Sequence, residues 1–232
     1  MLILAAPLPR LPDADLLPLC QCWAAHLSPC LADSQRGYLK KFSLSGPGLT
    51  ALASRLLARL LLLHALRGLG DSVAPLGSDT RGRPVMPGWL VNFSHSGQAA
   101  FCALRRGDRS RALLGLDAEA VTEHPPALRA FTPQEQARLS PRSALARWVI
   151  KEAALKAIGM GLATDPALLE TGPLSPRCGH ITADRQKLAW QLIPCPGHWL
   201  CLAWEGGSLS RPVLRWLCPQ WLDFPTPLFP TS

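Results

Sequence analysis

The apolar positions of the first half predict one short strand followed by two helices. Residues 2–4 form a short apolar run, and residues 13–31 carry apolar side chains at helical spacing. Residues 49–67 are rich in Leu, Ala and Arg, which favours a second and stronger helix. Because glycine is common just after a helix, we expect this helix to end at Gly68 or Gly70.

Three strands are expected to follow this helix. Two apolar runs, at 90–93 and 99–104, have the composition of strands, and residues 94–97 between them are interpreted as a tight connection. A basic turn at 105–111 then precedes a third strand at 112–117.

The second half repeats this order of elements. A proline-rich loop at 124–133 leads to a short helix near 135–139 and a long helix at about 143–158. Strand-like segments follow at 187–193, 198–204 and 213–217. Each half offers a long helix and then several strands, which predicts an α+β fold of two similar subdomains, residues 1–112 and 113–232.

The composition is that of a globular protein with a basic surface. Of the 232 residues, 48% are hydrophobic and 17% are charged, and the formal net charge is +8. A basic surface favours phosphorylated ligands or acidic proteins. Long Lys/Arg blocks interleaved with aromatic residues are missing from the sequence, so a dedicated nucleic-acid binder is not expected.

The cysteines and the apolar segments predict a cytoplasmic protein. None of the eight cysteines has the CxxC spacing of a zinc site, and several lie in apolar runs such as 101–104 and 200–203. We therefore expect buried, reduced thiols. The N-terminal apolar run stops at Pro7 without a basic segment, and the apolar stretch 56–66 is short and contains Arg59, so neither predicts a signal peptide or a membrane span.

Two carboxylates are expected at the end of the third strand. In Gly115-Leu116-Asp117-Ala118-Glu119, the two acidic residues are two positions apart, so an extended chain presents them on one face. Like charges side by side are unfavourable without a cation between them, and carboxylate oxygens suit Mg²⁺ or Mn²⁺. The alternative is that the strand has ended and both carboxylates are solvated.

A second group of polar residues lies on the long helix of the second half. Trp148, Glu152 and Lys156 are four residues apart and form one stripe. Glu152 and Lys156 have two possible interpretations: a simple surface ion pair, or a metal ligand or base beside a cation that holds a phosphate.

A third group is Asn92-Phe93-Ser94-His95-Ser96-Gly97. A histidine between two serines gathers hydrogen-bonding groups at one point. It is either an ordinary turn or an anion contact, since Arg81 and Arg83 lie shortly upstream. The chain around it has no G-x-S-x-G elbow of a hydrolytic triad.

The order of these motifs resembles a known family. The chain reads G-R-P at 82–84, N-F-S-H-S at 92–96, G-L-D-A-E at 115–119 and W-V-I-K-E-A-A-L-K-A-I-G-M-G-L at 148–162. This resembles the Sfp-type 4′-phosphopantetheinyl transferases, whose signature is G-K-P, N-x-S-H-S, G-x-D-x-E and W-x-x-K-E-A-x-x-K-x-x-G-x-G-L in that order.

The resemblance implies an enzyme, a holo-acyl-carrier-protein synthase. It would move the 4′-phosphopantetheine arm of coenzyme A to a serine of an acidic apo acyl or peptidyl carrier protein, using Mg²⁺ (or Mn²⁺). The active site would lie in the cleft between two similar α+β subdomains of a monomer. Neither nucleic acid nor membrane is an expected partner.

The resemblance also implies roles for individual residues. Asp117, Glu119 and Glu152 would hold the metal, and Glu152 would be the base for the serine hydroxyl. Lys156 would bind the pyrophosphate and help adenosine 3′,5′-bisphosphate to leave. The residues implied in coenzyme A binding are Arg36, Arg83, Ser94, His95, Asp117 and Lys156.

The sequence departs from the family pattern at several positions. Arg83 stands where the family usually has Lys, and Ala118 replaces a bulkier residue. Gln35 and Tyr38 occupy the places of two basic residues, so the neighbouring Arg36 is expected to take over the contact to the 3′-phosphate, with Lys40 or Lys41 as the alternatives. Two other functions stay open: a metal-dependent hydrolase acting on coenzyme A or a nucleotide, and a non-catalytic binding module.

Overall fold

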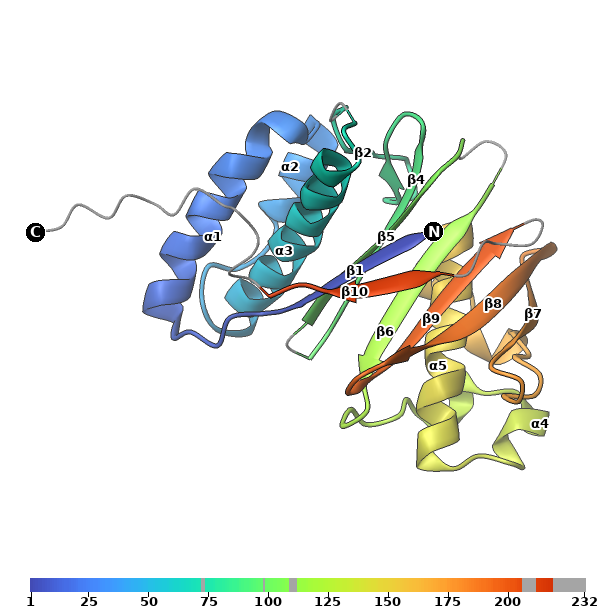
Figure 1. Ribbon diagram of the computed structural model, residues 1–232. Helices are drawn as coiled ribbons and strands as arrows, with labels where there is room; N and C mark the ends of the chain where they lie inside the picture. Colours follow the sequence, from blue (N-terminus) through green and yellow to red (C-terminus); the bar gives the residue numbers. More distant parts are fainter. Residues whose placement is uncertain (72–73, 98, 109–111, 206–211, 219–232) are drawn as a thin grey trace, which may run out of the picture.

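The computed structural model describes residues 1–71, 74–97, 99–108, 112–205 and 212–218. These residues form an α+β fold with two four-stranded sheets, in the strand orders β10-β1-β5-β4 and β6-β9-β8-β7 (Figure 1). The longer helices are α1 (Asp13–Leu27), α2 (Asp33–Leu39), α3 (Gly46–Gly68), α4 (Pro133–Gln136) and α5 (Pro141–Ile158). The strands are β1 (Leu2–Pro7), β2 (Gly77–Ser78), β3 (Pro84–Val85), β4 (Trp89–Ser96), β5 (Ala99–Arg106), β6 (Leu114–Ala120), β7 (Cys178–Ala183), β8 (Gln186–Cys195), β9 (His198–Glu205) and β10 (Val213–Trp216).

The chain passes from the first sheet to the second and then returns. β1 and β4 each pair antiparallel with β5, and all three come from the first 106 residues, whereas β10 comes from the end of the described chain and pairs in parallel with β1. The expected boundary between residues 112 and 113 therefore separates the strands of the two sheets with the exception of β10.

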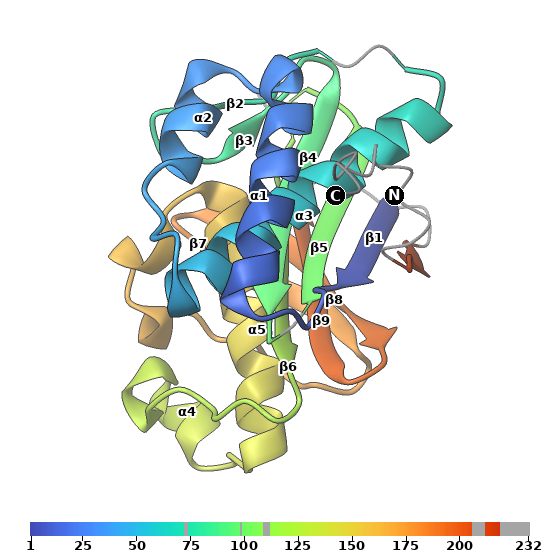
Figure 2. The ribbon, with the colours of Figure 1, turned by 90° about the vertical axis from the view of Figure 1, so that its left-hand side faces the viewer.

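The helix α3 forms the centre of the first core. Leu56, Leu57, Leu60 and Leu61 are 0% exposed, because the helix packs on β1 and β5 with one face while α1 covers another (Figure 2). Burying each leucine stabilises the fold by about 1.5–3 kcal/mol. By length and composition α3 could cross a membrane, but 78% of its most apolar window is buried inside the protein, as in a core helix. The predicted helix at 49–67 is confirmed and begins slightly earlier.

The helix α5 packs against the second sheet. Its first turn is capped by the Ser140 hydroxyl, which accepts from the backbone N–H of Ser143, and Gly159 ends it in a left-handed conformation with φ 75°. A side chain at Gly115 of β6 would meet the Ala153 carbonyl oxygen at 1.9 Å, so only glycine allows this close approach of α5 to β6. The predicted helix at 143–158 is confirmed, with Pro141 as its first residue.

Three sequence expectations about strands are wrong. β4 continues to Ser96, so 94–97 is not a connection, and β6 runs on to Ala120, so Asp117 lies inside a strand and not at its end. The strand β7 was not expected, because it carries one large apolar residue, Ile181, in a polar segment. Residues 109–111 of the predicted basic turn lie outside the described residues.

The eight cysteines, all within the described residues, form no disulfide with one another, but their environments differ. Cys20, Cys102 and Cys201 are buried, whereas Cys178 is exposed, so the expectation of buried thiols holds only in part. Burial raises the pKa of the Cys20 thiol to about 11, which leaves it protonated and unreactive at neutral pH.

Candidate active site

The site is built where the edge strands of the two sheets, β4 and β6, lie side by side. The side chains of Asn92, Ser94 and Ser96 exchange hydrogen bonds with backbone groups of β6, at donor–acceptor distances of 2.5 to 3.2 Å. Alternate residues of a strand share a face, so these three point toward β6 while Phe93 and His95 point the other way. The polar residues that predicted a turn therefore join the two sheets.

A cavity of about 500 Å³ opens beside this junction. Its volume falls within the usual range of small-molecule sites. Side chains from α2, α3, β4, β6, α5 and the segment 81–84 line it. The polar and aromatic lining residues are Gln35, Tyr38, Arg55, Arg59, Arg81, Arg83, Asn92, Phe93, His95, Asp117, Glu119, Trp148, Glu152 and Lys156.

Asp117 is the most enclosed carboxylate of the cavity, with 3% of its surface exposed. Its Oδ1 accepts hydrogen bonds from Lys156 Nζ at 2.6 Å and from Ser94 Oγ at 3.0 Å. Its Oδ2 is buried and has no hydrogen-bond partner among the described residues. Glu119 Oε2 accepts from Ser96 Oγ at 3.1 Å, so both serines of the motif hold a carboxylate.

The three carboxylates of the cavity destabilise one another when ionised. Burial raises the pKa of Glu119 to about 7, and the negative charge of Asp117 adds to this effect. Burial and the same neighbour also raise the pKa of Glu152 above its ordinary value. A cation bound among these side chains would reverse both effects.

Two arginines of α3, Arg55 and Arg59, also line the cavity, and we call them the arginine wall. Arg59 is 5% exposed, and its Nε and Nη2 donate to Gln35 Oε1 at 2.8 and 2.5 Å. Burial lowers the pKa of Arg59 to about 10, which still leaves it charged at neutral pH. Arg55 Nε donates to the Tyr38 hydroxyl at 2.9 Å. Gln35 and Tyr38 therefore orient two cations of the cavity, although neither is basic itself.

Arg81 and Arg83 attach the loop before β3 to the end of α5. Both donate through Nη1 to the carbonyl oxygen of Ile158, at 3.1 and 3.2 Å, and Arg83 Nε pairs with Asp79 at 2.7 Å. The last carbonyls of a helix lack partners within the helix and carry partial negative charge, so cations are favoured there.

His95 faces the cavity from β4. Desolvation within the cavity lowers the pKa of His95 to about 4, and the positive charges of Arg55 and Lys156 contribute. Its imidazole is therefore neutral at neutral pH and has one N–H to donate.

The structure brings together most of the residues that the sequence singled out. Arg83, His95, Asp117, Glu119, Glu152 and Lys156 all line the cavity. Ser94 does not line it but lies behind Asp117, with 2% exposure.

Arg36 lies apart from the cavity. Its guanidinium donates to the carbonyl oxygens of Ser28 and Leu31 and pairs with Asp33 at 2.6 Å. Sequence reasoning missed Arg55 and Arg59, because they occur in a leucine-rich helix that reads as core. Their spacing of four, which puts two cations on one helical face, was the available signal.

The carboxylate oxygens of Asp117 and Glu152 are chemically suited to bind a divalent cation. Asp117 Oδ2 and Glu152 Oε1 are both buried and have no hydrogen bond within the part of the chain that the structure describes, and hard oxygen ligands are those that Mg²⁺ prefers. Within the described ranges, no three His, Cys, Asp or Glu side chains are close enough together to hold a metal as they stand.

Comparison with known proteins identifies the second half of the chain. Residues 113–201 match the family model described as the 4'-phosphopantetheinyl transferase superfamily. This segment includes β6 and α5, and with them Asp117, Glu119, Glu152 and Lys156. No curated protein matches the chain. Residues 113–201 are therefore similar to the 4′-phosphopantetheinyl transferase superfamily.

Proposed function

We propose that the chain transfers the 4′-phosphopantetheine arm of coenzyme A to a serine of an apo acyl or peptidyl carrier protein. The products are the holo carrier protein and adenosine 3′,5′-bisphosphate. The observation that carries this proposal is the composition of one cavity, which four arginines, Lys156 and three carboxylates line together. Phosphoryl transfer depends mainly on positioning and charge neutralisation, and this set of side chains supplies both.

The cations of the cavity bind the anionic groups of coenzyme A. Arg55, held by Tyr38, contacts the 3′-phosphate together with the neutral imidazole of His95. Arg83 lies beside the adenine nucleotide, and Lys156 binds the pyrophosphate. Because hydrogen bonds already orient these side chains, little entropy is lost when the ligand binds. Arg36, which points elsewhere, has no part in this contact.

The carboxylates hold Mg²⁺, or Mn²⁺, through Asp117, Glu119 and Glu152. The ion, when bound, neutralises charge on the transferring phosphoryl group and on the pyrophosphate. Ser94 and Ser96 keep Asp117 and Glu119 in place from β4, so the donor set depends on contacts between the two sheets.

The transfer itself exchanges one P–O bond for another. The serine oxygen of the carrier forms a bond to the phosphorus that bears the pantetheine, and the bond from this phosphorus to the oxygen of the leaving nucleotide breaks. Glu152 takes the serine proton, directly or through a water molecule. Its place in the cavity lining beside Asp117 and Lys156 suits this role. Lys156 stabilises the charge on the leaving adenosine 3′,5′-bisphosphate.

The proposal includes the architecture and the partners. The two sheets with their helices act as two similar subdomains of a cytoplasmic monomer, with the active site in the cleft between them. The net charge of +8 favours an acidic carrier protein as partner. Nucleic acid and membrane are not part of this function.

A mass-shift assay tests the proposal. The protein is incubated with Mg²⁺, coenzyme A and a panel of apo carrier proteins, and each carrier is weighed by mass spectrometry. We expect one carrier to gain one phosphopantetheine. Hydrolysis of coenzyme A without a carrier mass change would instead support the hydrolase, and binding of coenzyme A without either reaction would support the binding module.

A further inference from the structure

A buried ion pair lies on a face of α5 that does not line the cavity. The side chains of Lys151 and Glu135 are both 0% exposed, with Lys151 Nζ 2.5 Å from Glu135 Oε2. Lys151 Nζ also donates to the carbonyl oxygens of Ala130 and Pro166, each at 3.0 Å. The three N–H bonds of the ammonium are therefore matched by three acceptors, which come from three different segments.

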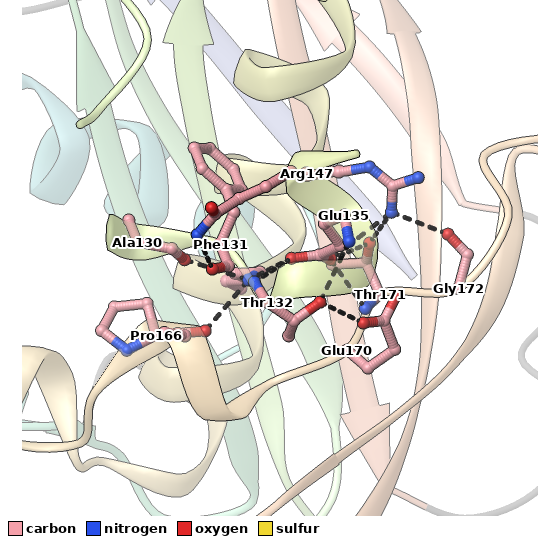
Figure 3. A network of polar contacts seen from close by, with 12 residues as sticks. Ala130, Phe131, Thr132, Glu135, Arg147, Pro166, Glu170, Thr171 and Gly172 are labelled. Atoms are coloured by element: carbon pink, nitrogen blue, oxygen red, sulfur yellow. Dashed lines mark hydrogen bonds and ion pairs between the residues drawn. The ribbon is translucent and has the colours of Figure 1, made fainter. Parts of the chain in front are cut away.

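The pair belongs to a larger set of contacts, drawn in Figure 3. Glu135 Oε1 accepts from the backbone N–H and the hydroxyl of Thr171, at 3.1 and 2.7 Å, and Oε2 accepts from the Thr132 N–H at 3.0 Å. Arg147, one turn before Lys151, lies 3.4 Å from Glu135 and donates to the Gly172 carbonyl at 2.8 Å. We call Thr132, Glu135, Arg147, Lys151 and Thr171 the Glu135 network.

The Glu135 network and the cavity contact neighbouring faces of the same helix. Successive residues of an α-helix point about 100° apart, and residues four apart share a face. Arg147 and Lys151 therefore form one stripe, and Trp148 and Glu152, each the next residue in sequence, form the adjacent stripe that lines the cavity. A rotation of α5 about its axis moves both stripes together.

Glu152 depends on such a restraint, because its own carboxylate is not held. Its Oε1 is buried and has no hydrogen-bond partner among the described residues, and the charge of Asp117 repels it. The direction of this side chain is therefore set by the backbone of α5. On the sheet side, the close contact at Gly115 fixes how near the helix lies, and buried apolar residues of α5 such as Val149 and Ala153 pack on the sheet. The Glu135 network adds directional polar contacts that tie the helix to α4 and to the segments at Ala130 and Pro166.

We propose that the Glu135 network fixes the rotation of α5 and so positions Glu152 toward Asp117, with Lys151 as the positioning residue. Any other rotation would leave a buried ammonium without its acceptors, which is strongly unfavourable. Removing the network would free α5 to turn slightly, and Glu152 would move away from Asp117 because the two charges repel. The effect of this on catalysis rests on the proposed function, whereas the placement of Glu152 does not.

Three variants separate positioning from stability. Lys151→Met removes the ammonium and leaves the buried Glu135 with Arg147, 3.4 Å away, as its cationic partner, and Glu135→Gln/Lys151→Met removes both charges of the pair. Leu27→Ala is the matched control, since Leu27 is 1% exposed and lies in the core of the first sheet. For each variant we would measure the thermal midpoint, kcat for transfer and KM for coenzyme A.

The expected result is a separation of stability from turnover. Lys151→Met lowers the thermal midpoint, and the double variant regains most of it, because a buried pair can be replaced by uncharged residues with little loss. Turnover stays about 100-fold low in both, since a misplacement of about 1 Å has an effect of this size. KM for coenzyme A rises less than kcat falls, because Arg55 and Arg59 of α3 are untouched, whereas Lys156 turns with α5. Leu27→Ala lowers the midpoint and keeps kcat.

Recovery of kcat together with the midpoint in the double variant would overturn the inference, because the network would then only stabilise the fold. Crystal structures of the wild type and the double variant provide a second test of the inference, which does not depend on measuring enzyme activity. We expect the Glu152 and Asp117 carboxylates to lie farther apart in the double variant, and an unchanged separation overturns the inference. A wild-type protein that transfers no phosphopantetheine contradicts the proposed function alone, and the structures still decide the inference.

Discussion

The two long helices hold their charged side chains in the cavity in different ways, as Arg55 and Arg59 of α3 and Glu152 of α5 show. On α3, Arg55 and Arg59 are oriented by the hydrogen bonds that they donate to Tyr38 and Gln35. On α5, Glu152 has a buried oxygen that has no partner among the described residues, and its direction follows from the backbone. The arginine wall is thus oriented before an anion binds. Asp117 and Glu152, by contrast, each keep a carboxylate oxygen without a hydrogen bond among the described residues, and a cation can bind these oxygens.

Removing the charge of Glu152 should lower turnover more than any other change considered below. We expect Glu152→Gln to lower kcat by about 10²–10⁴-fold, the usual contribution of a general base, while coenzyme A binding in the absence of metal changes little. Steady-state kinetics and calorimetry check the two parts. Glu205→Gln, at the end of β9, is the control. Unchanged turnover in Glu152→Gln would contradict the proposed role.

Removing Arg55 should damage the arginine wall and leave the chemistry intact. Arg55→Ala should raise KM for coenzyme A by about 10–100-fold, as expected for the loss of a hydrogen bond to a charged group. The same variant should affect 3′-dephospho-coenzyme A much less. The matched control is Arg36→Ala, because Arg36 lies outside the cavity. A larger loss in Arg36→Ala than in Arg55→Ala would reverse this assignment.

The closeness of α5 to β6 can be tested at Gly115. Gly115→Ala should lower the free energy of unfolding by about 1–3 kcal/mol or more, since the added methyl group meets the Ala153 carbonyl. Gly37→Ala in α2 is a matched control, because an added methyl there has no atom within 4 Å and alanine favours the helix. Urea unfolding of both variants gives the comparison. Equal stability for the two would mean that the helix does not lie this close.

The smallest expected effect is a pH dependence of stability at Glu119. Its pKa is raised from 4.5 to about 7 in the folded protein, so between these values the folded state binds more protons than the unfolded state. The contribution of Glu119 to stability therefore falls as the pH rises through this window. We expect Glu119→Gln, in metal-free buffer with a chelator, to gain thermal stability over the wild type above pH 7 and to show little gain below pH 4.5. A difference that does not vary with pH would contradict the raised pKa.

The sequence predicted the helices and the acidic residues better than the strands. α3 and α5 have long apolar periodicity and recognisable glycine ends, so their bounds were correct to within a few residues. The expected clustering of Asp117, Glu119, Glu152 and Lys156 agrees with the lining of one cavity. Whether they hold a metal or act on coenzyme A stays a prediction.

The errors have one physical origin, which is that contacts between distant segments override local pattern. Ser94 and Ser96 look like turn residues, yet they extend β4 because their hydroxyls bind the backbone of β6. Arg36 looked like the replacement for a missing basic residue, but α2 turns it toward its own helix end. Arg59 was taken for part of a core helix, and only its contact with Gln35 reveals its place in the cavity.

The central claim is transfer of an intact arm from coenzyme A to a carrier serine. The most direct measurement follows carrier mass and released adenosine 3′,5′-bisphosphate in the same reaction, with a carrier whose acceptor serine is replaced by alanine as control. The account predicts that the two products appear in equal amounts, only with the intact carrier, and that Glu152→Gln abolishes both together. Release of nucleotide from coenzyme A at the same rate with the alanine carrier would contradict it.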